Sequence, residues 1–303
     1  MFFRSLLLAS FACLLAACGS GGGGGSSVET LTVGAGALTP VYPANTLTGT
    51  KTERAELENG LVVYLGHEDG TVAEYRLRID RMGTPSDATD DVLFVERNGG
   101  AAVTYEPIVV SGEDGTVFSL SGTAENGDFI RLSVDEIFAT TDSHPYVLTA
   151  RTETSSGGLN LIGRGAGGLE TAVSDLPDSA DYVGEYTLTS AESSFEIIGG
   201  LTMRVDFANG QVSGTHDGLF DGPFDTGRIE GDVEGAVSGS RLAGTMTVTG
   251  DTTGALDFAG MVFGPDGERI GLGIAGTAET GGGVEPIGGS ALMHQGDDYN
   301  YGG

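Results

Sequence analysis

A period-two alternation of apolar and polar residues between Tyr182 and Thr277 is the feature that most constrains the fold of this chain. In residues 201–207, apolar residues occupy every second position, and threonine, arginine and aspartate lie between them. This pattern is typical of a β-strand with one buried face. The Asn209-Gly210 pair that follows favours a two-residue hairpin turn. Further strands are expected at residues 211–216, 227–233, 242–249, 255–262 and 269–276.

These segments predict an all-β domain over residues 182–278, in which eight antiparallel strands close into a small barrel. Glycines recur on the same strand faces as the apolar residues, and small residues there relieve crowding where a barrel curves. Eight strands enclose a space just wide enough for side chains, so a wide lumen for a lipid-like ligand is not expected. The side chains expected to fill the interior are Met203, Phe207, Met246 and Phe258.

The N-terminus has the pattern of a bacterial lipoprotein leader. Arg4 precedes the apolar run from Leu6 to Ala17, which is shorter than the ~20 residues that span a bilayer. The run ends in Leu-Ala-Ala-Cys18, which resembles the lipobox of bacterial lipoproteins. The resemblance implies cleavage of the signal peptide 1–17, diacylglycerol on the Cys18 sulfur and an acyl group such as palmitate on its amine. The alternative is an ordinary secretory signal with a chance cysteine.

The residues behind the leader form a Gly/Ser-rich tether, residues 18–27, which is expected to be flexible. Gly19 stands where an aspartate would suggest retention at the inner membrane, so the outer membrane is favoured by analogy. The formal net charge of −29 disfavours nucleic acid as a partner, because phosphate binding requires clustered basic residues. The acidity has two interpretations: solubility, or a field that steers a cationic ligand.

Residues 28–165 carry strand signals with less regular spacing, and they predict a β-rich domain ahead of the barrel. Strands are expected at residues 72–79, 129–134 and 146–149. Residues 166–181 are expected to be a linker, and the Gly-rich, polar residues 279–303 a disordered tail. Turns are expected at the Asn-Gly and Asp-Gly pairs that end in Gly60, Gly70, Gly99, Gly115 and Gly127.

Three segments of the last third of the chain are similar to the motifs of one family. They are residues 176–186 (LPDSADYVGEY), residues 205–214 (VDFANGQVSG) and residues 260–271 (GMVFGPDGERIG). In this order, and behind a lipoprotein leader, they resemble the transferrin-binding-protein-B-like surface lipoproteins of bacteria. In the closing motif Gly267 replaces the usual alanine, and Leu272 stands where a second glycine belongs.

This resemblance implies a β-rich handle, residues 28–165 here, followed by a barrel, in a single lobe that is expected to be a monomer. It also implies an outer-membrane lipoprotein at the cell surface that captures an iron carrier, haem, a haemoprotein or another protein ligand. The alternative is a non-catalytic envelope lipoprotein that acts as a structural partner of another outer-membrane protein.

Motifs for catalysis or metal binding are absent from the sequence. It has no Gly-x-Ser-x-Gly nucleophile motif and no phosphate-binding loop. We therefore expect no enzymatic activity, no metal site and no cofactor; a hydrolase with paired carboxylates is the weakest hypothesis. A histidine or a tyrosine is left open as a ligand of a haem iron. The four histidines are far apart in the sequence: His67, His144, His216 and His294.

The candidate ligand-binding residues are Phe220 and Phe224. They lie in a Gly- and Pro-rich segment, residues 218–227, that is expected to be a loop of the barrel. Loops on a rigid scaffold concentrate binding residues, and aromatic anchors dominate such contacts. The alternative is that one or both phenylalanines fold inward and plug an end of the barrel.

Overall fold

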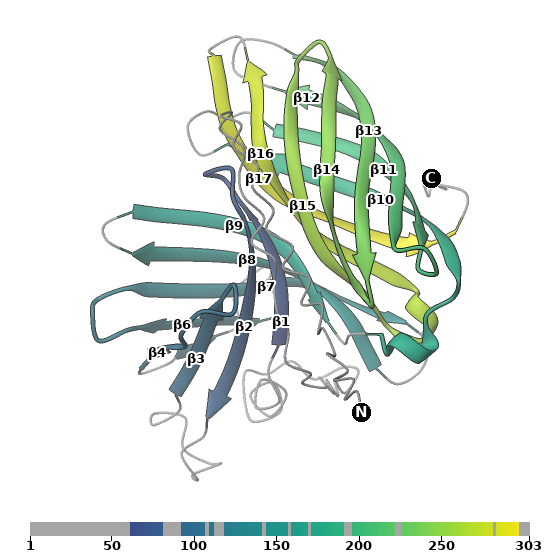
Figure 1. The fold of residues 1–303 in the computed structure, drawn as a ribbon. Helices are drawn as coiled ribbons and strands as arrows, with labels where there is room; N and C mark the ends of the chain where they lie inside the picture. Colours follow the sequence, from purple (N-terminus) through teal and green to yellow (C-terminus); the bar gives the residue numbers. More distant parts are fainter. Residues whose placement is uncertain are drawn as a thin grey trace, which may run out of the picture.

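The computed structural model describes residues 61–80, 92–106, 109–111, 118–140, 144–156, 159–168, 171–190, 196–221, 226–280 and 283–296. Its strands form a nine-stranded N-terminal sheet and a closed eight-stranded barrel (Figure 1). The helices in these residues are two single turns, η1 (Val173–Asp175) and η2 (Pro265–Gly267). Neither has the length and apolar character of a membrane-spanning helix. The leader, Cys18 and the tether lie outside the described residues.

The barrel confirms the all-β fold with eight antiparallel strands, because the last strand pairs with the first. Its burial pattern follows the alternation of the sequence: in β13, Ile229, Val233 and Val237 are buried and the charged residues between them are exposed. The predicted hairpin is present, but the expected two-residue turn is wrong: residues 207–210 separate the paired Asp206 and Gln211, and Gly210 has a positive φ of 72° while Asn209 does not. The strands are β10 (Ser179–Thr189), β11 (Glu196–Asp206), β12 (Gln211–Asp221), β13 (Thr226–Ser238), β14 (Arg241–Gly250), β15 (Gly254–Phe263), β16 (Arg269–Thr280) and β17 (Gly283–Gln295).

The prediction of a disordered tail over residues 279–303 is wrong, because most of this segment forms β17. This strand pairs with β16 on one side and with β10 on the other, and so closes the barrel. Its inward side chains include Ile287, Ala291 and Met293, all buried in the barrel core. Adjacent glycines at 288 and 289 interrupt the apolar alternation, which hides the strand from a search for period-two patterns. Residues 297–303 lie outside the described residues.

The boundaries around the barrel also differ from the expected ones. The barrel runs from Ser179 to Gln295 instead of over residues 182–278. The connection that precedes it is shorter than the expected linker 166–181, because β9 extends to Gly168. Within this connection, the backbone N–H of Thr171 donates to the carbonyl of Val262, and its hydroxyl donates to the carbonyl of Gly264.

The N-terminal sheet accounts for the β-rich domain expected over residues 28–165, of which the described part begins at Leu61. The predicted strands 72–79, 129–134 and 146–149 are confirmed within β2, β7 and β8. All pairings are antiparallel, in the order β4-β3-β2-β1-β9-β8-β7-β6-β5. The strands are β1 (Leu61–His67), β2 (Val72–Asp80), β3 (Val92–Arg97), β4 (Val103–Tyr105), β5 (Val109–Ser111), β6 (Phe118–Thr123), β7 (Phe129–Thr140), β8 (His144–Ser156) and β9 (Leu159–Gly168).

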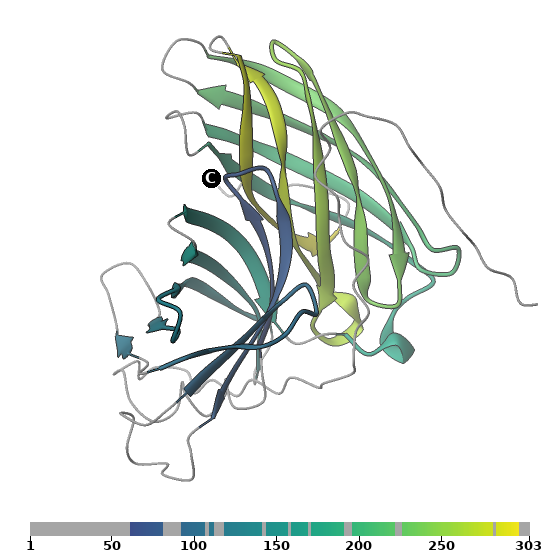
Figure 2. The same cartoon turned by 60° about the vertical axis from the view of Figure 1, so that its left-hand side comes forward.

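The turns of this sheet follow the predicted dipeptides where they are described. Gly70, Gly99 and Gly127 all have positive φ, as the turns after β1, β3 and β6 require. Gly60 and Gly115 lie outside the described residues. The sheet is curved (Figure 2), and its end strand β4 comes close to the residue that follows β6, near the other end of the sheet. Tyr105 of β4 forms an isolated antiparallel bridge with Ala124, and the adjacent backbone N–H of Glu106 donates to Thr123 at 3.1 Å.

The N-terminal sheet packs against the outside of the barrel, where β1, β2 and β9 cover β15, β16 and β17 (Figure 1). We call this contact the seam. Its glycines permit close backbone approach: a Cβ atom on Gly66 would overlap the carbonyl oxygen of Ile274, and one on Gly288 would overlap that of His67. The seam is apolar at its centre, with buried side chains from both sheets: Tyr64, Val72, Ala166, Ala259, Met261, Phe263 and Ala275.

A single added methyl group at the seam is expected to destabilise the protein. In Gly66→Ala the new Cβ meets backbone atoms of β16 and β17, which cannot rotate away. Overpacking of this kind costs about 1–3 kcal/mol of unfolding free energy. The matched control is Gly200→Ala, whose Cβ would meet only the flexible Asp217 side chain at 3.3 Å, with an expected change within about 0.5 kcal/mol. Urea unfolding measures both, and equal losses would contradict a tightly packed seam.

Candidate functional site

The interior of the barrel is filled by side chains, as the sequence predicts. Met203, Met246 and Phe258 are buried in it, and Phe207 is partly buried against the same core. Two tyrosines add to the filling. Tyr182 donates a hydrogen bond from its hydroxyl to the carbonyl of Gly267 at 2.7 Å, and the Tyr186 hydroxyl lies 3.1 Å from Nδ1 of His216. Burial raises the pKa of both phenols, so they stay neutral in the core. The interior thus serves stability.

Phe220 lies inside the barrel and Phe224 lies outside the described residues. The expected loop 218–227 is mostly strand, because β12 continues to Asp221 and β13 begins at Thr226. Phe220 takes an inward position of β12 and is 4% exposed, which is the second of the two alternatives that the sequence leaves open. A contact of either phenylalanine with a ligand stays a prediction.

Two of the four histidines are buried and engaged by protein atoms. His67 lies in the core of the N-terminal sheet, with Nε2 3.1 Å from the Tyr75 hydroxyl. His216 lies in the barrel, with Nε2 2.6 Å from the carbonyl of Thr247. His294 is half-buried on β17, and the side chain of His144 lies outside the described residues. Within the described ranges, no three His, Cys, Asp or Glu side chains are grouped as a metal site would require.

The buried His67 predicts a loss of stability in mild acid. Burial, assisted by the positive charge of Arg97, lowers its pKa from 6.5 to about 4. The unfolded chain therefore takes up a proton on His67 more readily than the folded chain does. The stabilisation that comes from the neutral His67 is complete above pH 6.5 and is lost as the pH falls toward 4. At about 1.4 kcal/mol per pKa unit, the expected loss is about 3 kcal/mol.

Denaturant unfolding at several pH values measures this loss. The variant His67→Gln, which can still bond the Tyr75 hydroxyl, is expected to lose less stability between pH 6.5 and 4 than the wild type does. Burial also lowers the pKa of His216, so some acid sensitivity remains in the variant. The control His294→Gln removes a more exposed imidazole, whose pKa is lowered by burial and by the nearby Arg269, and is expected to change the pH profile less than His67→Gln does. An unchanged profile in His67→Gln would contradict the assignment.

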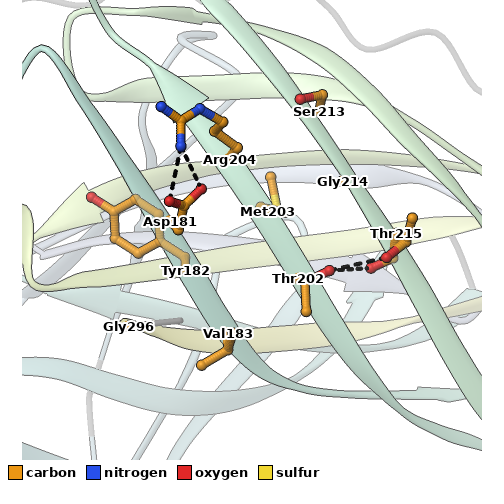
Figure 3. A pocket seen from close by; sticks show the side chains of 10 residues that line it. All are labelled: Asp181, Tyr182, Val183, Thr202, Met203, Arg204, Ser213, Gly214, Thr215 and Gly296. Atoms are coloured by element: carbon orange, nitrogen blue, oxygen red, sulfur yellow. Dashed lines mark hydrogen bonds and ion pairs between the residues drawn. The ribbon is translucent and has the colours of Figure 1, made fainter. Parts of the chain in front are cut away.

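An open depression lies on the outer face of the barrel, over β10, β11 and β12 (Figure 3). Its volume is about 460 Å³. Arg204 forms a bidentate ion pair with Asp181, at 3.1 and 2.9 Å, and the hydroxyls of Thr202 and Thr215 lie 3.0 Å apart. These groups can exchange hydrogen bonds with a ligand, but they include no nucleophile beside a general base. The lining residues are Asp181, Tyr182, Val183, Thr202, Met203, Arg204, Ser213, Gly214, Thr215 and Gly296.

Two exposed apolar side chains lie further along the same strands. Ile198 of β11 and Leu219 of β12 are opposite each other in the register, 52% and 61% exposed. Both occupy outward positions, where the neighbouring outward residues of their strands are polar, charged or glycine. The sequence signal for them is a break in the alternation, since each is adjacent to an inward apolar residue, Ile197 or Phe220. The outer face of β10–β13 is therefore the candidate binding surface.

Comparisons with known proteins give a distant similarity. No protein-family model matches the chain, and no curated protein sequence matches it. A double mutant of the vaccine antigen Transferrin Binding Protein B from Haemophilus parasuis Hp5 matches with a TM-score of 0.39 and 14% identity, over 78% of this chain and 46% of that chain. Intact Ap-TbpB, with N and C lobes, matches with a TM-score of 0.36 and 15% identity, over 77% and 46%. The chain thus spans just under half the length of these structures.

Proposed function

We propose that the chain is a lipid-anchored outer-membrane protein that captures a protein ligand at the cell surface through the outside of its barrel. The filled interior is the observation that carries this proposal. Tyr182, Tyr186 and Phe258 are almost completely buried there, so a ligand meets the barrel from outside. Small molecules are usually held in concave, mostly apolar sites, whereas the outer face of β10–β13 is open and most of its outward residues are polar, charged or glycine. A macromolecule fits this shape better.

The anchor and the location are proposed from the sequence. The lipobox-like residues before Cys18 and the Gly/Ser-rich tether supply an attachment that leaves the folded body free in the aqueous phase. The net charge of −29 opposes close contact with anionic lipid headgroups. The resemblance of residues 176–186, 205–214 and 260–271 to transferrin-binding-protein-B-like lipoproteins supports display at the surface. It favours a protein that carries iron or haem as the ligand.

Lipid attachment is tested by labelling growing cells with a radioactive or clickable palmitate. The wild-type chain is expected to take up the label and to fractionate with outer membranes. The variant Cys18→Ser keeps every described residue and is expected to lose both the label and the membrane association. A label that persists in Cys18→Ser, or a wild-type chain found in the soluble fraction, would refute the anchor.

A further inference from the structure

The exposed pair Ile198 and Leu219 lies at the centre of a defined patch on the barrel. The register places Thr187 of β10 beside Ile198, and Arg228 of β13 beside Leu219. This row therefore crosses four strands, with the two apolar side chains in its middle. Figure 1 shows β11, β12 and β13 on the side of the barrel turned away from the N-terminal sheet. We call the surface centred on Ile198 and Leu219 the outer patch.

Acidic side chains flank the apolar pair on both sides. On one side of the apolar pair, the next outward-facing row across the strands contains Glu185, Asp217 and Glu230. Gly200 lies between Glu185 and Asp217 in this row. On the other side, Glu196 lies opposite Asp221. Because Gly200 has no side chain, the surface is lower beside Ile198. A Cβ atom built on Gly200 would lie 3.3 Å from the Asp217 carboxylate. The side chains of these five acidic residues are exposed or half-buried.

The basic residues near the outer patch do not neutralise it. Arg204 is the basic residue of β11, and its guanidinium is bound to both oxygens of Asp181. Arg228 stands at the end of the apolar row beside Leu219, as one basic residue against the five acidic residues of the flanking rows, Glu185, Asp217, Glu230, Glu196 and Asp221. The outward residues of β13 beyond it continue the acidic surface with Asp232 and Glu234. The outer patch thus has an apolar centre that is surrounded mainly by acidic side chains.

We propose that the outer patch docks a basic protein surface on which a bulky apolar side chain lies between lysine or arginine residues. The apolar side chain packs on Ile198 and Leu219 beside Gly200, and the basic side chains pair with Asp217, Glu230 and the acidic residues around them. Burial of the apolar pair supplies most of the affinity, since a few central residues dominate protein interfaces. The charges set the orientation and the rate of encounter. A second copy of this chain fits poorly, because two acidic surrounds repel each other.

This inference rests on the proposed function, but its test needs neither cells nor the natural ligand. The protein is the mature chain with Cys18→Ser, which keeps every described residue. The probe is a short fluorescent peptide in which leucine alternates with lysine, and binding is measured by anisotropy at low and at raised salt. Two control peptides carry serine in place of leucine or glutamate in place of lysine.

Three variants separate the contributions to binding. Ile198→Thr with Leu219→Thr removes the apolar centre and keeps residues suited to strands. Asp217→Asn with Glu230→Gln removes charge alone. Val284→Thr is the matched control, because Val284 is 70% exposed on β17, away from the outer patch. Thermal unfolding is expected to show that all three variants fold, since surface substitutions change stability little.

The proposal predicts that the peptide binds the wild type and Val284→Thr equally and binds Ile198→Thr/Leu219→Thr about tenfold more weakly. The charge variant is expected to bind more weakly at low salt, with a reduced dependence on salt. The serine and glutamate peptides are expected to bind worse than the probe. Equal binding by wild type and the threonine variant would overturn the proposal, as non-specific attraction to an acidic protein predicts that result.

Analytical ultracentrifugation of the same proteins tests whether a second copy of this chain covers the outer patch. A wild-type dimer that dissociates in Ile198→Thr/Leu219→Thr would show that a second copy covers the surface, and would overturn the proposal. Different results would refute the proposed function, namely the absence of a lipid on Cys18 or a location of the protein away from the cell surface. The peptide measurement on purified protein is unaffected by either.

Discussion

Replacing Glu74 by alanine is expected to lower the free energy of unfolding by about 3–5 kcal/mol. Glu74 lies on the face of β2 that turns toward the barrel, and its side chain is 2% exposed. Arg241 of β14 reaches across the seam to its carboxylate at 2.7 Å and to the Tyr64 hydroxyl at 2.8 Å. Tyr64 and Arg76 each donate to Glu74 at 2.8 Å. The variant leaves the Arg241 guanidinium, 18% exposed, without its counter-charge.

The pKa of Glu74 agrees with this arrangement. Burial alone would raise the pKa, but hydrogen bonds from Arg76, Tyr64 and Arg241 outweigh it and hold the pKa below its usual value. A carboxylate with a lowered pKa in the folded state stabilises the protein above its unfolded pKa of 4.5. That contribution is lost as the pH falls through the folded pKa. The wild type and Glu74→Ala should therefore become more alike in strong acid.

The matched control is Asp181→Ala, which removes the acid of the exposed Arg204 pair on the barrel. There the two side chains are 57% and 43% exposed, so the expected loss is below about 1 kcal/mol. The double variant Glu74→Leu/Arg241→Met replaces both buried charges and is expected to recover most of the stability lost in Glu74→Ala. Urea unfolding measures all of these proteins. Equal losses in Glu74→Ala and Asp181→Ala would contradict a buried ion pair at the seam.

Ending the chain at Thr280 is expected to abolish folding of the barrel. The truncation removes β17, which pairs with β10 over Tyr182–Thr189 and with β16 over Arg269–Thr280. It exposes the edges of both strands, and open edges invite aggregation. It also takes Ile287 and Met293 out of the core. We expect insoluble protein, or a soluble chain without cooperative thermal unfolding.

The control truncation ends the chain at Gly296, just after β17, and removes only residues 297–303. It retains every described residue, so soluble yield, circular dichroism and melting temperature are expected to match the full chain. A soluble, cooperatively folded protein that ends at Thr280 would contradict closure of the barrel by β17. It would then support the tail that the sequence pattern suggested.

The parts of the fold that follow from the sequence are those in which one strand face is apolar and the other polar. Strands such as β11 and β13 are of this kind, and their alternation predicts both the strand and its inward side chains. The place of the hairpin turn after β11 follows from Asn209-Gly210, because glycine readily adopts the positive φ of Gly210, but the turn spans residues 207–210 instead of the expected two. The filling of the barrel by Met203, Met246 and Phe258 follows from the same alternation.

Features that depend on a tertiary contact, such as β17 as a whole and the covered outer face of β15, were not predicted in this way. β17 presents Gly288 to the seam and Gly289 to the crowded pairing with β10, so its apolar period is broken. In β15, Ala259, Met261 and Phe263 are outward but buried, because the N-terminal sheet covers them. In the sequence, these outward residues alternate with the inward apolar residues and together form one continuous apolar run. Such a run indicates a strand that is covered on both faces.

The candidate site was harder to derive than the fold. Phe220 stood out because it is aromatic and lies near Gly and Pro, yet its place in the alternation of β12 directs it inward. Ile198 and Leu219 become a pair only through the register between β11 and β12, which joins residues distant in sequence. The buried role of Glu74 depends on an arginine from the barrel. Such pairings between separate strands are set by tertiary structure.

Protease treatment of intact cells, followed by detection of the protein with an antibody to the folded body, tests the central claim most directly. If the chain is a surface-displayed binding protein, the body is digested on intact cells while a periplasmic marker protein survives. Protection of the body until the outer membrane is permeabilised would contradict the account. That outcome would favour an envelope lipoprotein whose partner lies in the periplasm.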